Sequence, residues 1–257
     1  MKPLAPILGI LLAFAATLLA RIDFASAGQP GLDPAEAGQA LVEKLRSSVP
    51  AEDAEFSGLL KTTQSDGRTR AIPITCKITT GQPSWQVVYE TRSASGITAE
   101  KLVIVHEAGQ PNQYLHARAS AAEEAPGTPA RLAVEQIATP LAGSDFWLMD
   151  LGLEFIHWPK QRVIQNNAMR KSRPCDVLES INPQPAPRGY ARVVSWLDKE
   201  TGGPILAEAY DRQNKLVKEF SIRSFKKVDG QWQLQEMDIS DVKKRSRTRL
   251  EFDLDRK

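Results

Sequence analysis

The chain of 257 residues is poor in the residue types that most often carry metal or nucleophilic chemistry, with three histidines and two cysteines. His106, His116 and His157 are scattered, and no two have the spacing of a helical or loop metal site. The sequence also lacks a G-x-S-x-G turn, a phosphate-binding glycine loop and a recognisable cysteine–histidine frame. We therefore predict a protein that is not an enzyme and has no metal and no cofactor. A hydrolase whose two carboxylates meet only in the fold stays an alternative.

An excess of charge of one sign is also absent, since 33 Lys and Arg face 31 Asp and Glu. This balance indicates no particular class of partner. A basic run near the C-terminus places Arg245, Arg247 and Arg249 on one side of a predicted strand, which favours a solvated hairpin face. Attraction to anionic lipid headgroups or an acidic partner is the alternative. No aromatic stacking pattern accompanies the run, so we expect no nucleic-acid partner.

Residues 1–27 are ordered like a secretory signal peptide, with a basic start, an apolar run from Leu4 to Ala20 and small residues before the cut. The run is short for a membrane span, and no cysteine follows it for lipid attachment. These features predict a cleaved leader and a mature protein in the periplasm. Arg21 and Asp23 lie between the run and the cut, which leaves an uncleaved anchor as the alternative.

The two cysteines, Cys76 and Cys175, lie far apart in apparent strands. A disulfide between them is chemically allowed in an oxidising compartment and would pin an early strand to a late one. Two buried thiols are the alternative.

Residues 28–257 have the composition of one β-rich domain, and we expect a monomer. Asp33, Pro34 and Glu36 predict a capped helix that continues to about Ser48. This helix has one apolar stripe, which consists of Ala37, Leu41, Leu45 and Val49.

Strands separated by turns follow from Glu55 onward. In an early strand, Trp85, Val87 and Tyr89 alternate and share one face. Short links in the second half predict an antiparallel meander. Its strands are expected at Tyr190–Asp198, Ile205–Tyr210, Leu216–Phe225, Gln231–Ile239 and Thr248–Leu254.

The stretch from Gly143 to Pro159, GSDFWLMDLGLEFIHWP, is too apolar for an ordinary loop. Ser144 or Asp145 can cap a helix, which we predict over 146–156. Apolar side chains would cover nearly every face of such a helix, so it must be buried or covered by a ligand. A helix that plugs the open end of a sheet core is the simpler interpretation.

Part of this stretch resembles the GSDF-x-x-x-DL signature of the LolA-like outer-membrane lipoprotein-sorting proteins. The matching residues are Gly143, Ser144, Asp145, Phe146, Asp150 and Leu151. The resemblance implies a mainly β, α+β fold over roughly residues 55–252. In this fold a strongly curved antiparallel sheet forms an incomplete β-barrel, and short helices form a lid over an apolar cavity.

The same resemblance implies a periplasmic carrier that shields the acyl chains of lipoproteins, or of another lipidated molecule, on the way to the outer membrane. An inner-membrane release complex and an outer-membrane acceptor would be its partners. Well-studied carriers hold the lid through polar contacts to an arginine. Arg68, Arg70 and Arg92 are available here, and none is assigned.

The candidate lipid-binding residues divide into two sets. Those of the cavity wall are Trp85, Val87 and Tyr89, and those of the lid are Phe146, Trp147, Leu148, Leu151 and Phe155. The alternative function is a non-catalytic periplasmic protein-binding or envelope-sensing module, which would use an exposed edge strand or loop of the same fold.

Overall fold

The computed structural model describes residues 33–120, 125–228 and 231–254. The expected signal peptide lies outside the described residues. Among the described helices, none combines the length and the apolar character that crossing a membrane requires.

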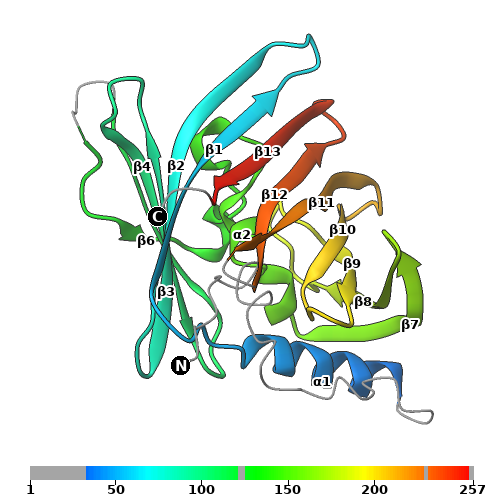
Figure 1. Cartoon of the computed structure of the whole chain (residues 1–257). Helices are drawn as coiled ribbons and strands as arrows, with labels where there is room; N and C mark the ends of the chain where they lie inside the picture. The colour runs from blue at the N-terminus through cyan, green and yellow to red at the C-terminus, as the bar shows by residue number, and fades with distance from the viewer. Residues whose placement is uncertain (1–32, 121–124, 229–230, 255–257) are drawn as a thin grey trace.

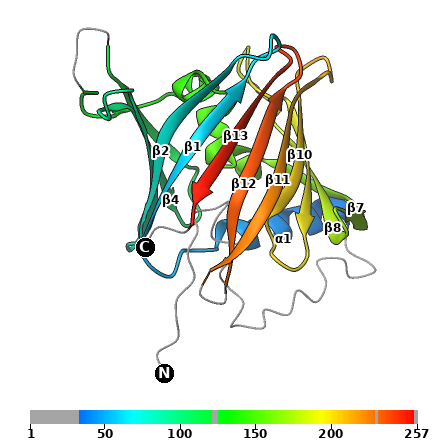
Figure 2. The same ribbon diagram turned by 45° about the horizontal axis from the view of Figure 1, so that its top comes forward.

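Thirteen strands form a single antiparallel sheet that curves strongly without closing into a barrel (Figures 1 and 2). Its order is β6-β5-β4-β3-β2-β1-β13-β12-β11-β10-β9-β8-β7, so β6 and β7 are the two edges. The first half contains β1 (Ala54–Thr63), β2 (Thr69–Thr79), β3 (Ser84–Arg92), β4 (Thr98–Glu107), β5 (Gln113–Arg118) and β6 (Ala130–Arg131). The second half contains β7 (Lys160–Arg170), β8 (Arg173–Ile181), β9 (Arg192–Asp198), β10 (Pro204–Tyr210), β11 (Leu216–Val228), β12 (Gln231–Asp241) and β13 (Ser246–Asp253). This arrangement confirms the expected incomplete barrel.

Pairing of β1 with β13 joins the two halves, with Leu60 opposite Leu250. The predicted alternation is confirmed in β3, where Trp85, Val87 and Tyr89 are all buried on the concave face. The five strands of the predicted meander are also present, with ends that move by a few residues.

The basic residues near the C-terminus lie in and beside the last hairpin. Arg247 and Arg249 lie on the convex face of β13, as expected, and Arg249 pairs with Asp238 at 2.8 Å. Arg245 instead lies in the turn before the strand, with φ of +57°. The run is therefore partly neutralised by acidic neighbours on β12.

Helix α1 (Pro34–Arg46) begins as predicted, because the Asp33 carboxylate accepts a hydrogen bond from the Ala35 amide at 3.0 Å. The helix packs against the edge strand β7 (Figure 1). Its buried residues are Ala37, Gly38, Leu41, Val42 and Leu45. Val49 lies beyond the end of the helix and is 49% exposed, so it is not part of the stripe.

The single helix expected over 146–156 is wrong. Two short elements take its place, α2 (Leu148–Leu151) and η4 (Glu154–His157). Two further short helical turns, η2 (Val134–Gln136) and η3 (Leu141–Gly143), precede them. Leu153 adopts a left-handed φ of +48°, which no α-helix accommodates. Neither expected cap operates: the Asp145 carboxylate binds β13, and the Trp147 amide donates to Asp150.

The disulfide that the sequence allowed is not formed. Cys76 in β2 and Cys175 in β8 are both buried free thiols. Six strands lie between β2 and β8 in the order of the sheet, whereas a disulfide needs Cα atoms within about 7 Å. The alternative of two buried thiols therefore holds.

Replacement of Gly38 by alanine should test the close approach of α1 to β7. A Cβ atom at this position would lie 2.5 Å from the backbone nitrogen and Cα of Arg162, which no rotamer change relieves. We expect Gly38→Ala to lower the free energy of unfolding by about 1–3 kcal/mol in thermal or urea denaturation. Glu43→Ala, on the exposed side of α1, should change it by no more than about 0.5 kcal/mol. A Gly38→Ala variant that is more stable than the wild type would mean that the higher helix propensity of alanine outweighs the steric clash with Arg162.

Candidate functional site

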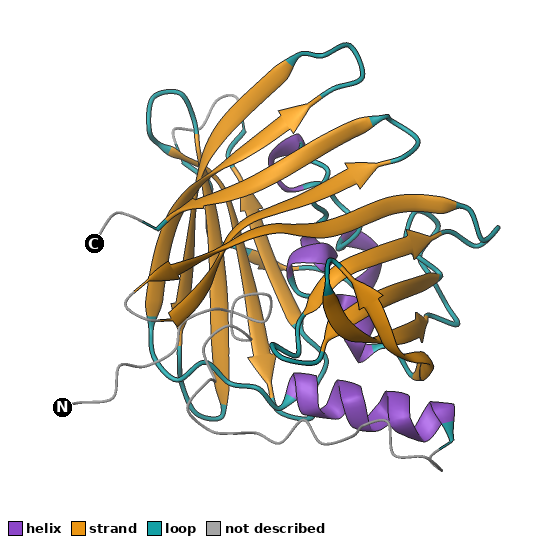
Figure 3. Cartoon of the chain, turned by 45° about the vertical axis from the view of Figure 1, so that its right-hand side comes forward, coloured by secondary structure: helices purple, strands orange, loops and turns teal. Residues whose placement is uncertain are grey.

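The chain between the two edge strands crosses the concave side of the sheet. We call residues 132–159 the lid segment, because they leave β6 and return as β7 after passing over this face. Figure 3 shows its short helices inside the curve of the strands. Its fully buried side chains include Leu141, Phe146, Leu148 and Ile156. The lid segment therefore supplies the apolar cover that an open curved sheet needs.

A small cavity of about 40 Å³ remains between the lid segment and the second half of the sheet. It is lined by Asp150, Leu153, Phe155, Tyr190, Val193, Pro204, Ala207, Ala209, Lys218, Phe220 and Ile239. A water molecule needs about 10–15 Å³, so the cavity has room for a few water molecules and not for an acyl chain.

The structure does not bring the eight candidate lipid-binding residues around this one cavity. Phe155 lines it, whereas Phe146, Leu148 and Leu151 are buried in the core beside it. Trp147 is half-buried. The three wall candidates lie across the concave face on β3, away from the cavity lining.

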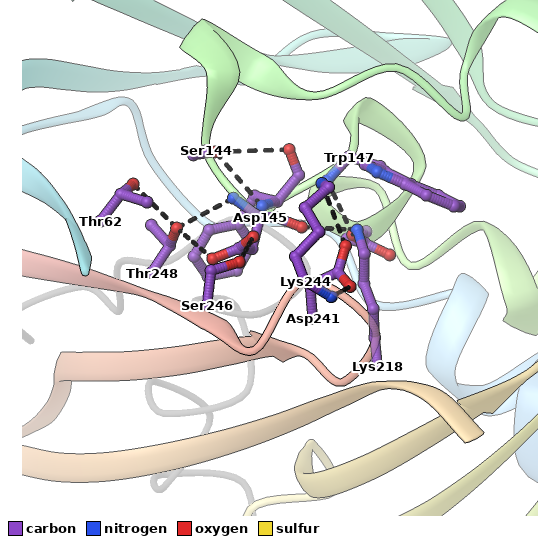
Figure 4. Close-up of polar contacts among 11 residues, drawn as sticks. Thr62, Ser144, Asp145, Trp147, Lys218, Asp241, Lys244, Ser246 and Thr248 are labelled. Carbon is purple, nitrogen blue, oxygen red and sulfur yellow. Dashed lines mark hydrogen bonds and ion pairs between the residues drawn. The ribbon is translucent and has the colours of Figure 1, made fainter. Parts of the chain in front are cut away.

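Sequence reasoning missed Lys218 of β11, whose side chain is 2% exposed. Its ammonium group donates to the Asp145 carbonyl oxygen at 2.5 Å (Figure 4). The same group lies 3.3 Å from Oδ2 of Asp150. Burial lowers the pKa of Lys218, and the neighbouring Asp150 carboxylate opposes that shift. One feature of the sequence indicated its burial: in an alternating strand, Lys218 lies on the same face as the apolar residues Phe220 and Ile222.

Asp150 binds another residue of the lid segment, Trp147, and also Lys218 of the sheet. Its Oδ2 accepts the Trp147 amide at 2.7 Å, and its Oδ1 accepts the Tyr190 hydroxyl at 2.9 Å. The rings of Trp147 and Tyr190 stack with centroids 4.8 Å apart, and the Lys218 ammonium lies 3.7 Å from the Trp147 centroid. This cation–π contact gives the buried charge a third partner, after the Asp145 carbonyl and the Asp150 carboxylate.

Asp145 of the GSDF motif attaches the lid segment to the last strand (Figure 4). Ser246 donates to its Oδ1 at 2.6 Å and Thr248 to its Oδ2 at 2.9 Å. The Asp145 amide donates back to the Thr248 hydroxyl at 2.9 Å, and Thr248 also contacts Thr62 of β1. Gly143, two residues before Asp145, has a left-handed φ of +69°. The motif thus acts as an attachment point.

A second attachment lies on the first half of the sheet. Glu100 of β4 accepts the Ala142 amide at 2.9 Å and binds His116 at 2.7 Å and Arg118 at 2.8 Å. Burial alone would raise the pKa of Glu100, but His116 and Arg118 outweigh burial and hold it below its ordinary value. Of the three arginines considered from the sequence, Arg70 reaches the lid segment, where it donates to the Ala142 carbonyl oxygen.

A third attachment joins β5 to the turn at residues 152–154. The Tyr114 hydroxyl donates to the Glu154 carboxylate at 2.9 Å, and Asn112 donates to the Gly152 carbonyl at 2.8 Å. Burial raises the pKa of Glu154 to about 7, despite hydrogen bonds that lower it. Polar contacts therefore hold the lid segment at separate points around an apolar middle. Among the described residues, no group of three or more metal-ligating side chains is found.

Lys218→Met should show how much more the buried contacts of Lys218 contribute to stability than a surface ion pair does. The variant keeps the length of the side chain but leaves the Asp145 carbonyl and Asp150 without their cation. We expect a loss of about 3 kcal/mol in the free energy of unfolding, measured by urea denaturation. Lys244→Met is the matched control, since Lys244 is 55% exposed and pairs with Asp241 at 3.0 Å, and should cost less than about 1 kcal/mol. Equal losses would contradict a special role for Lys218.

Because the pKa of Glu154 is raised, the free energy of unfolding should fall as the pH rises. The folded protein holds the Glu154 proton more tightly than the unfolded chain, whose pKa is near 4.5. The resulting stabilisation is complete below pH 4.5 and is lost as pH rises through about 7. Between pH 5 and 8 the wild type should lose up to about 3 kcal/mol relative to Glu154→Gln in denaturation titrations. Parallel curves for the two proteins would show that Glu154 ionises normally.

By sequence, residues 102–254 match a protein family described as "-like: Uncharacterized protein". No curated protein matches the chain. Several solved structures are similar at low identity. A DUF1329 family protein from Desulfovibrio piger has a TM-score of 0.70 at 17% identity, and the match covers 87% of this chain and 92% of that one. A putative outer membrane lipoprotein-sorting protein domain from Vibrio parahaemolyticus has a TM-score of 0.68 at 17% identity, covering 84% and 90%.

The third similar structure is a LolA superfamily protein from Nitrosomonas europaea, with a TM-score of 0.57 at 15% identity, covering 84% of this chain and 91% of that one. The fold expected from the GSDF-x-x-x-DL resemblance is thereby confirmed. Because the family match extends over more than half of the sequence, the chain belongs to that family, and its fold is the LolA-like fold of lipoprotein-sorting proteins.

Proposed function

We propose that this protein is a periplasmic carrier that encloses the acyl chains of lipoproteins, or of another lipidated molecule, between the lid segment and the concave face of the sheet. The observation that supports the proposal most is that apolar and polar residues of the lid segment have separate roles. Its apolar side chains fill the concave face, while its polar contacts lie at separate attachment points. A cover of this kind can be displaced and replaced by another apolar occupant.

The energetics favour such an exchange. Each buried methylene contributes about 0.8 kcal/mol, so an acyl chain of roughly fifteen methylenes gains on the order of ten kcal/mol by leaving water. Displaced side chains such as Phe146 and Phe155 would lose a comparable contribution per unit area. A carrier whose lid and cargo compete for one apolar face therefore binds reversibly, as transfer between two membranes requires.

The structure corresponds to the closed form in this proposal, since the present cavity is too small for an acyl chain. Opening would break the contacts of Lys218 with Asp145 and Asp150 and the contact of Arg70 with Ala142. Arg70 then has the role that the resemblance gives to a lid-holding arginine. An inner-membrane release complex and an outer-membrane acceptor would load and unload a monomer, with no bond-making step.

The test is native mass spectrometry with lipid extraction on mature protein purified from the periplasm of a two-membrane bacterium. We expect acylated molecules bound near one per protein. Ala207→Leu places a larger side chain in the cavity that Ala207 and Phe155 both line, and should reduce the bound fraction several-fold at a stability cost of about 1–3 kcal/mol.

Ala130→Leu is the matched control, because Ala130 is exposed on β6 and should change neither lipid content nor stability. A ligand-free wild type that also takes up no added acyl chain would contradict the carrier proposal. Lipid content unchanged in Ala207→Leu would place the acyl chain elsewhere in the molecule.

A further inference from the structure

A second hollow lies where the lid segment meets the first half of the sheet. We call it the arginine groove; it encloses about 640 Å³ and is open to solvent. Its lining contains Arg70, Ile72, Thr91, Arg92, Glu100 and Arg118, together with Ala142 of the lid segment. Sheet register places Thr91 opposite Glu100 and Glu100 opposite Arg118, so these side chains share one face.

The groove carries a net positive charge. Three arginines, Arg70, Arg92 and Arg118, line it with one acidic residue, Glu100, whose carboxylate is already engaged by His116, Arg118 and the Ala142 amide. Arg92 also lines a second hollow beside Glu90. Arg70 and Arg92 donate to the neutral carbonyl oxygens of Ala142 and Gly96. Neither pairs with a carboxylate in the part of the chain that the structure describes. Two guanidiniums are thus available to an anion.

An independent observation at the same place is the Thr91 hydroxyl. Thr91 lines the groove and is 1% exposed, and its Oγ1 is buried without a hydrogen-bond partner. Buried hydroxyls are nearly always hydrogen-bonded, and one left alone costs about 1–3 kcal/mol. An oxygen-rich ligand that enters beside Arg70 would supply the missing acceptor.

The groove is continuous with the apolar concave face. Ile72 lines it and packs against the hydrophobic core, and Leu102 follows Glu100 on the same face of β4. One end of this surface is therefore cationic and the other apolar. An amphiphile with an anionic head and an acyl tail fits both ends at once.

We propose that the arginine groove binds the phosphate of an anionic amphiphile whose acyl chain occupies the concave face. This inference rests on the proposed carrier function and names its class of cargo. Phosphate suits the site because a guanidinium can donate two parallel hydrogen bonds to it. The phosphate would compete with the Ala142 carbonyl for Arg70, so headgroup binding weakens one attachment of the lid segment.

Calorimetric titration of the mature full chain tests this with three probes: lysophosphatidic acid, a monoacylglycerol of the same chain length, and inorganic phosphate. We expect lysophosphatidic acid to bind about tenfold tighter than the uncharged lipid, as one or two charge-assisted hydrogen bonds supply. Arg70→Gln with Arg92→Gln should abolish this preference, so that the two lipids bind the variant with equal affinity. Arg92→Gln alone, which keeps the Arg70 contact with the lid segment, should remove part of it.

Lys243→Gln with Arg245→Gln is the control, because it removes the same charge from the exposed hairpin turn and should keep the preference. Equal binding of the two lipids, or equal loss in the control, would overturn the groove while the carrier function stands. Binding of neither lipid would contradict the carrier itself. If inorganic phosphate alone then bound in an Arg70-dependent manner, the groove would be a free-phosphate site and the lipid assignment would be wrong.

Discussion

The concave face of an open curved sheet must be covered, and the rest of this structure depends on that constraint. Thirteen strands that curve without closing leave one side of the sheet apolar and facing inward. In a closed barrel the opposite wall would cover that side. Here the connection between the two edge strands does so, because it has to cross from β6 to β7 in any case. Topology thus fixes which segment becomes the lid.

The polar contacts of the lid segment explain its broken secondary structure. A regular helix would satisfy its own backbone and present mainly side chains to the sheet. Short turns instead leave backbone groups free for the sheet: the Ala142 amide and carbonyl bind Glu100 and Arg70, and the Asp145 carbonyl binds Lys218. Burying the Lys218 charge has a desolvation cost, which Asp150 and the Trp147 ring offset.

The five strands of the second-half meander and their antiparallel order could be predicted from the sequence, because short links report directly on antiparallel pairing. The pairing of β1 with β13, which joins the two halves, could not. The lid segment could be located but not shaped. Its composition indicates burial, whereas its shape depends on contacts with strands that are distant in sequence. Asp145 binds Thr248 of β13, and Glu154 binds Tyr114 of β5. Lys218 and Glu100 were missed for the same reason, since a single charged residue in a strand acquires its meaning only from what faces it.

The two free thiols have a consequence for the assembly of the fold. Cys76 is fully buried and burial raises its pKa to about 12, so the folded protein offers almost no thiolate to an oxidant. The unfolded chain has no such protection. In an oxidising compartment, a bridge formed early would tie β2 to β8 and prevent the six strands between them from entering the sheet. A chain that folds in such a compartment would need sheet formation to outpace thiol oxidation, so the speed of folding would decide how much of it reaches the native sheet.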